Sequence, residues 1–163
     1  FSKMCLTPML EYGRQALEDN KKGVATEALE QVALAIVVTT AIVSIFLTRD
    51  FTPDYNSGLA HACFYALTAY PVIEKEHLHG EVVGFGVLYA LLVDGQQEEF
   101  EKIYALNKEL GLPVRIADIG ITEEQFFETM DRIPQMSDIR HYPYAVTKEM
   151  LMKAYETIEQ LPV

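Results

Sequence analysis

Apolar positions recur at three- and four-residue intervals along most of the chain, which is the spacing expected of helices with one buried side. No stretch alternates apolar and polar residues for long enough to predict a sheet. The segments predicted as helical are Ser2–Glu18, Thr26–Thr48, Gly58–Ala69, His79–Val93, Gln96–Leu110, Thr122–Ile133 and Thr147–Leu161. Seven helical segments without a sheet predict an all-α fold, built as an irregular bundle.

The segment Thr26–Thr48 contains the longest apolar run, Val32–Leu47. Its many β-branched residues would permit a strand, but the segment is several times longer than an ordinary strand. The run is shorter than the roughly 20 residues that a helix needs to cross a bilayer, and it includes Thr39, Thr40 and Ser44. We therefore predict a buried central helix and not a membrane span.

Turn-forming residues mark the connections between these helices. The predicted connections are Asp19–Gly23, Asp50–Gly58, Glu74–His77, Val114–Gly120 and Pro134–Val146. Thr122 with Gln125 three residues later has the pattern of a capping box, and Gly111 followed by Pro113 is typical of a helix end. Inside the segment His79–Val93 the three glycines Gly80, Gly84 and Gly86 suggest close approach by another backbone or a ligand.

The composition suits one compact, soluble domain over residues 1–163, since 50% of the residues are hydrophobic. The 24 acidic residues against 13 basic ones give a net charge of -11, which disfavours binding to nucleic acid. Cys5 and Cys63 lie in apolar, helix-like surroundings without a CxxC spacing, so we interpret them as free thiols. No secretory signal pattern is visible, and we expect a reducing, cytoplasmic location.

Two of the four histidines, His61 and His79, lie near the starts of two predicted helices that flank a short polar connection. Imidazole is a common ligand of divalent metals, and catalytic metal sites draw ligands from separate elements. The spacing alone also fits histidines that cap helices, or histidines in a core whose ring nitrogens are hydrogen-bonded. His77 is interpreted as a solvated histidine of the polar connection, and His141 as a surface-loop residue. Asp50 and Asp54 are the nearest preceding carboxylates, and we assign them to turns.

The motifs SGLAHA, LTAYP and HGEVVGFGVL occur in this order between Ser57 and Leu88. Together with the ELGLPV turn at Glu109–Val114, they resemble the C-terminal domain of the iron- or zinc-dependent polyol dehydrogenases, and among these the glycerol dehydrogenases most closely. The resemblance implies the helical half of a two-domain fold like that of dehydroquinate synthase. It also implies that His61 and His79 bind a catalytic Zn²⁺ or Fe²⁺ together with one aspartate.

In the family this aspartate precedes the helix with which the chain opens, and an N-terminal nucleotide-binding domain precedes the aspartate. We therefore expect these residues to be the C-terminal part of an NAD-dependent dehydrogenase of about twice the length, acting on glycerol or another small polyol or alcohol. The isolated part is expected to be inactive, and its exposed apolar surface could support a homo-oligomer. Zinc and iron both accept such ligands, so the identity of the metal stays open.

The chain departs from the family pattern at Phe64, where close glycerol dehydrogenases often carry a second histidine, and at Tyr65, where some iron-type relatives do. We interpret both residues as part of the core or of a pocket wall, and not as catalytic residues. The alternative function is a non-catalytic, acidic helical domain that binds other proteins, which the net charge and the histidine lost at Phe64 would also fit.

Overall fold

The computed structural model describes residues 2–47 and 57–162, so the predicted loop Asp50–Gly58, with Asp50 and Asp54, lies almost entirely outside the described residues. Regular structure in the described ranges is helical throughout, which confirms the all-α prediction. The chain forms two compact units, called unit 1 (Phe1–Asn56) and unit 2 (Ser57–Val163). A single domain over residues 1–163 stays a prediction.

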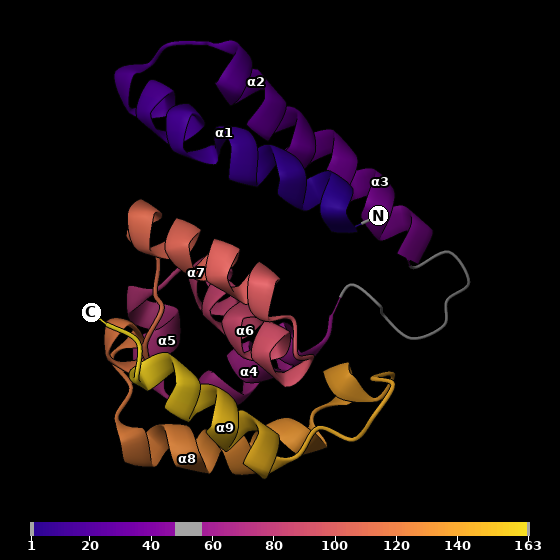
Figure 1. Ribbon diagram of the computed structural model, residues 1–163, viewed down its shortest axis with the longest axis vertical. Coiled ribbons are helices and arrows are strands. Elements are labelled where there is room, and N and C mark those ends of the chain that lie inside the picture. Colours follow the sequence, from indigo (N-terminus) through magenta and orange to yellow (C-terminus); the bar gives the residue numbers. More distant parts are fainter. Residues whose placement is uncertain (1, 48–56, 163) are drawn as a thin grey trace. The chain divides into compact units, whose positions relative to one another are not determined.

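Unit 1 is a hairpin of two long helical segments that run antiparallel (Figure 1). They are α1 (Ser2–Lys22) and the continuous stretch of α2 (Glu27–Leu34), the π-helical turn η1 (Ala35–Thr39) and α3 (Thr40–Leu47). The connection predicted at Asp19–Gly23 is wrong for its first four residues, because α1 continues to Lys22 and turns at Gly23 with φ 67°. The buried Asp19 carboxylate closes this turn by accepting hydrogen bonds from Gln15 and Thr26 at 2.7 and 2.6 Å.

The long second helix is where predicted, but its predicted burial is wrong in the described structure. Small side chains, chiefly Ala16, Ala28 and Ala35, form the buried contact of the hairpin, and they let the two backbones approach closely. Most of the large apolar side chains of the second helix are therefore exposed, whereas Val43 is buried. By length and composition alone, the 21-residue helix Glu27–Leu47 would suffice to cross a membrane, since its most apolar 18-residue stretch has a mean hydropathy of 2.0. Only 6% of that stretch is buried.

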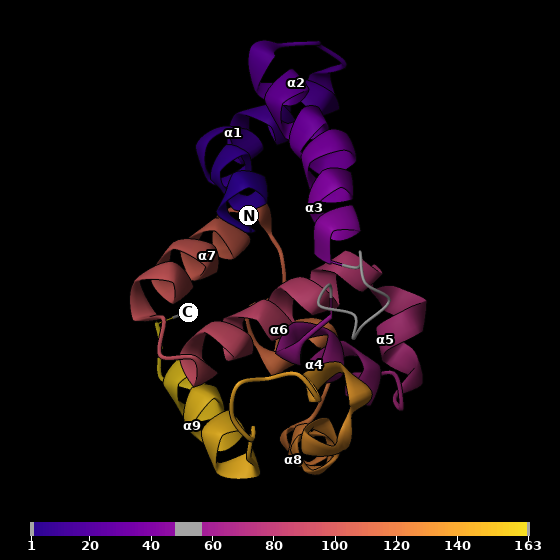
Figure 2. The same ribbon diagram turned by 90° about the vertical axis from the view of Figure 1, so that its right-hand side faces the viewer.

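Unit 2 is built around α4 (Leu59–Leu67) and α6 (His79–Val93), which cross in close contact (Figure 2). Its other elements are α5 (Pro71–Glu76), α7 (Gln97–Leu110), η2 (Ile116–Ile119), α8 (Glu123–Arg132), η3 (Ile133–Gln135), η4 (Ser137–Ile139) and α9 (Lys148–Glu159). The sequence pattern missed α5, a short helix that begins at Pro71, where proline is well tolerated because the first helical amide needs no partner.

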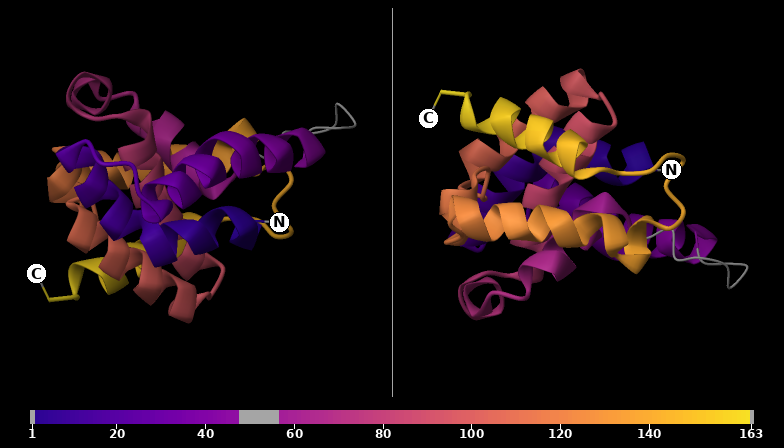
Figure 3. Two further views of the ribbon diagram at one scale, coloured as in Figure 1. Left: turned by 90° about the horizontal axis from the view of Figure 1, so that it is seen from above. Right: turned by 90° about the horizontal axis from the view of Figure 1, so that it is seen from below.

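The core of unit 2 is aromatic and aliphatic. Phe85 and Tyr89 on α6 contact the ring of Phe126 on α8, with ring centres 5.9 and 5.2 Å apart. Helices α8 and α9 lie side by side over this cluster (Figure 3). The capping box at Thr122 and Gln125 is confirmed, and so is the end of α7 at Gly111, which has φ 72°.

One of the three glycines of α6 explains how closely α4 and α6 approach. A Cβ atom at Gly86 would lie 2.6 Å from the carbonyl oxygen of Ala60, so no other residue fits without a shift. The predicted close approach to another backbone is thus confirmed at Gly86. At Gly80 and Gly84 a Cβ would meet nothing within 4 Å.

Candidate metal and substrate site

The crossing of α4 and α6 brings together the two histidines that the sequence singled out. His61 lies in the first turn of α4, one residue after Ala60, and His79 is the first residue of α6. Leu78 precedes α6 in extended conformation, and its amide donates a hydrogen bond of 3.0 Å to the Glu81 carboxylate, which fixes the start of the helix. Both histidines are therefore held on the ends of packed helices.

The imidazole rings of His61 and His79 have their centres 5.6 Å apart, at an interplanar angle of 43°. Two imidazoles that share one tetrahedral zinc through bonds of about 2.0–2.1 Å have ring centres roughly 5–6 Å apart. The pair therefore suits two nitrogen ligands of one divalent cation. Among the residues that the structure describes, no group of three or more His, Cys, Asp or Glu side chains gathers as a complete metal site.

Two aromatic side chains of α4 surround this pair. Phe64 is buried and stands edge-on to His79, with ring centres 4.4 Å apart. Tyr65 is exposed and lies 6.3 Å from the ring of His61. His79 itself is exposed. The histidine pair thus has an apolar contact at the buried Phe64, whereas His79 and Tyr65 are exposed to solvent.

Tyr142 holds the start of α4, a role that the sequence analysis missed. Gly58 precedes the helix and offers no side-chain cap, and the Tyr142 ring lies 3.6 Å from the position of a Cβ at Gly58. The pKa of Tyr142 is raised to about 12, chiefly by burial and further by the nearby Asp94 and Cys63, while a hydrogen bond from the Leu59 amide acts in the opposite direction. An isolated tyrosine in a loop carries no periodic signal from which this contact could have been predicted.

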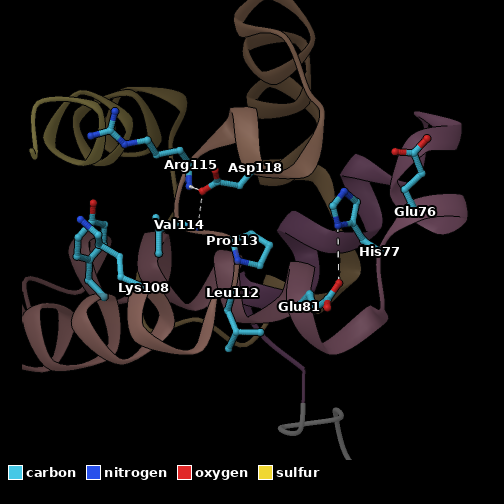
Figure 4. Close-up of a pocket in the computed structure, with 11 residues that line it drawn as sticks. Glu76, His77, Glu81, Lys108, Leu112, Pro113, Val114, Arg115 and Asp118 are labelled. Carbon is cyan, nitrogen blue, oxygen red and sulfur yellow. Dashed lines mark hydrogen bonds and ion pairs between the residues drawn. The ribbon is translucent and has the colours of Figure 1, made fainter. Parts of the chain in front are cut away.

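The other two histidines, His77 and His141, belong to no group of three or more potential metal ligands among the described residues. The prediction of a solvated His77 is wrong, because its side chain is 15% exposed and its Nδ1 lies 3.7 Å from the Glu81 carboxylate. It lines a cavity of about 550 Å³ together with residues that include Glu76, Glu81, Lys108 and Arg115 (Figure 4). His141 is exposed on its loop, in line with the surface reading.

Both cysteines are free thiols, as predicted. Cys63 belongs to α4 and is fully buried, and burial raises the pKa of its thiol to about 12. A thiol that stays protonated at neutral pH is neither a nucleophile nor a metal ligand. Cys63 therefore belongs to the core of unit 2.

No protein-family model matches the chain. Glycerol dehydrogenase from Thermotoga maritima is 28% identical over 98% of this chain, and that from Escherichia coli O6:H1 is 32% identical over 76% of it. A solved structure of a probable glycerol dehydrogenase from Sinorhizobium meliloti 1021 superposes with a TM-score of 0.76 at 21% identity, over 95% of this chain. The chain spans 43%, 31% and 42% of these three proteins.

The match covers nearly the whole chain but less than half of each relative, so the fold corresponds to one helical part of a larger dehydrogenase. The chain corresponds to the C-terminal helical part of glycerol dehydrogenases and fits the metal-dependent polyol dehydrogenase family. The resemblance that its motifs indicated is thereby confirmed.

Proposed function

We propose that this chain is the metal-binding, substrate-side part of an NAD-dependent dehydrogenase that oxidises glycerol or a related small polyol or alcohol. The approach of the His61 and His79 rings to 5.6 Å is the observation that carries the proposal. The similarity to glycerol dehydrogenases supports the same reaction class. The proposed location is the cytoplasm, in keeping with two free thiols.

In this proposal His61 and His79 bind the same divalent cation, each through one ring nitrogen. When bound, Zn²⁺ or Fe²⁺ supplies Lewis-acid polarisation of the alcohol oxygen, which lowers the pKa of the hydroxyl. Phe64 excludes water from one side of His79 and restricts the orientation of its ring. The open side beside the exposed Tyr65 leaves room for a small alcohol.

The third ligand and the nucleotide site belong, in this proposal, to an upstream part of a longer protein. The three relatives compared above are more than twice as long as the stretch that matches, and this supports a missing nucleotide-binding domain. NAD supplies the redox chemistry in such enzymes, so the role of this chain is to hold the reacting carbon in place. The 163-residue chain alone should not reduce NAD.

Titration of the chain with Zn²⁺ by calorimetry tests the metal site. We expect one Zn²⁺ per chain, and loss of binding in His61→Ala and in His79→Ala. His141→Ala is the matched control, because it removes an imidazole from an exposed loop and should leave the affinity unchanged. Equal loss in all three variants would mean nonspecific binding and would reject the assignment.

A second experiment tests the reaction. The coding sequence upstream of Phe1 should encode a glycine-rich nucleotide loop and an Asp, and the longer protein should reduce NAD with glycerol in a metal-dependent way. A longer protein that binds no metal, or an upstream sequence without such a loop, would instead favour the acidic protein-interaction domain.

A further inference from the structure

The loop between η4 and α9 contacts both helices that carry the histidine pair. Its Tyr142 ring lies 3.6 Å from the position of a Cβ at Gly58, directly before α4. The hydroxyl of Tyr144, two residues later, donates a hydrogen bond to the carboxylate of Asp94, the residue at which α6 ends. The loop, residues 140–146, is called the tyrosine loop below. It joins the start of one histidine-bearing helix to the end of the other.

The start of α4 receives its cap from the tyrosine loop. The first amides of a helix have no partners within the helix, and a side-chain oxygen of the preceding residue commonly accepts a hydrogen bond from one of them. In α4 the preceding residue is Gly58, which makes no such bond. The oxygen of Tyr142 accepts from the Leu59 amide instead, two residues before His61. Tyr142 therefore caps α4 from outside the helix.

Tyr144 holds the Tyr142 ring in this position. The two rings meet edge to face, with centres 5.4 Å apart and planes at 88°, which is a favoured geometry for aromatic pairs. Residues 141–147 belong to no helix, so side-chain contacts decide where the rings of this loop lie. The Tyr142 amide donates to the Ile139 carbonyl at 3.1 Å, which fixes the backbone but not the ring. The ring is held by Tyr144, and Tyr144 by Asp94.

We propose that Tyr144 is a positioning residue for the proposed metal site. Anchored on Asp94, it holds Tyr142 against the first turn of α4. That turn carries His61, so the tyrosine loop sets where this imidazole lies relative to His79. Residues that orient a metal ligand without touching the metal contribute to its affinity, because a ligand held in place loses less freedom on binding. The inference rests on the proposed function for the metal itself, but the hold on α4 can be measured without metal.

Amide hydrogen exchange on the metal-free chain tests the hold on α4. Tyr144→Phe removes the hydroxyl and keeps the ring. We expect the Ala62 amide, which donates to the Gly58 carbonyl in the first turn, to exchange at least about fivefold faster in this variant. Calorimetric titration should show Zn²⁺ binding weakened by about three- to tenfold.

Two substitutions of Asp94 separate the hydrogen bond from other effects at this position. Asp94→Asn keeps an oxygen that accepts from the Tyr144 hydroxyl and should behave like the wild type in both measurements. Asp94→Ala removes the acceptor and should behave like Tyr144→Phe. The double variant with both Asp94→Ala and Tyr144→Phe should be no worse than either single variant, because both remove the same contact.

Tyr155→Phe is the matched control, because Tyr155 donates a hydrogen bond of 2.7 Å to the Glu123 carboxylate between α8 and α9. It should leave the exchange of the Ala62 amide and the Zn²⁺ affinity unchanged. Equal effects of Tyr155→Phe and Tyr144→Phe would overturn the proposal, as would faster exchange in Tyr144→Phe without weaker Zn²⁺ binding.

The metal site and the tyrosine loop can fail separately. A wild-type chain that binds no Zn²⁺ would reject the metal site and, with it, the role of Tyr144 in positioning a ligand. The exchange rates of the Ala62 amide would then still decide whether Tyr144 holds the start of α4. A wild-type chain that binds Zn²⁺ as tightly as Tyr144→Phe does would reject the positioning role alone.

Discussion

At the scale of single residues, Gly86 sets how closely the two helices that carry the histidines approach. Gly86→Ala would place a Cβ 2.6 Å from the Ala60 carbonyl oxygen and push α4, with His61, away from α6. We expect a loss of about 1–3 kcal/mol in the free energy of unfolding, as for other overpacked contacts, and weaker Zn²⁺ binding. Urea denaturation and calorimetry measure the two effects.

Gly84→Ala is the control for this substitution, because a Cβ there meets nothing within 4 Å. It should raise stability by up to about 1 kcal/mol through helix propensity and leave Zn²⁺ affinity unchanged. If both variants bound Zn²⁺ like the wild type, the contact at Gly86 would have no part in positioning the histidines.

Phe64 offers a complementary prediction, since its ring lies 4.4 Å from that of His79. Phe64→His would add a third imidazole beside the pair and should tighten Zn²⁺ binding by at least about tenfold, because structural and catalytic zinc sites use three or more protein ligands. Phe64→Leu keeps the wall apolar and should not tighten binding. Unchanged affinity in the histidine variant would mean that position 64 faces away from the metal.

At the scale of elements, the start of α4 depends on a loop residue distant in sequence. Tyr142→Phe removes the acceptor for the Leu59 amide and should cost about 0.5–1.5 kcal/mol at neutral pH. Because the pKa of Tyr142 is about 12 when folded and 10 when unfolded, the wild-type contribution is present below pH 10 and is lost towards pH 12.

The variant should therefore be less stable near neutral pH and lose less stability between about pH 10 and 12. Thermal unfolding across this range measures both. Tyr65→Phe is the control, because the Tyr65 ring is exposed. Parallel pH curves for wild type and Tyr142→Phe would contradict the assignment.

The elements themselves show what a single sequence can predict. Local signals sufficed for α6, for the box at Thr122 and for the end of α7 at Gly111, because periodicity and caps act within a few residues. The hydrophobic pattern did not predict the helix Pro71–Glu76, because its six residues are too few to show a helical repeat. The approach of His61 to His79 also could not follow from their spacing, because α5 intervenes and only the packing of α4 on α6 closes the gap; the family resemblance supplied that expectation.

At the scale of the whole molecule, the error about the long helix has a physical cause. A strongly apolar helix is expected in a core, but burial depends on what else packs against it, and that partner need not be in the same hairpin. The interior of unit 1 is filled mainly by alanines, so most of the large side chains of Val32–Leu47 lie on the surface, although Val43 is buried. The periodicity of the sequence can locate such a helix, but it does not show which other element packs against the apolar side chains.

The proposed metal site predicts a coupling between ligand binding and the stability of the molecule. Zn²⁺ binds a folded pair of imidazoles far better than an unfolded chain, so free Zn²⁺ at about 100 times its Kd should raise the free energy of unfolding by about 2.7 kcal/mol. The rise should vanish in His61→Ala and reverse on chelation by EDTA. A melting temperature that Zn²⁺ raises equally in wild type and His61→Ala would show that the cation stabilises the chain elsewhere, and the pair at α4 and α6 would lose its assigned role.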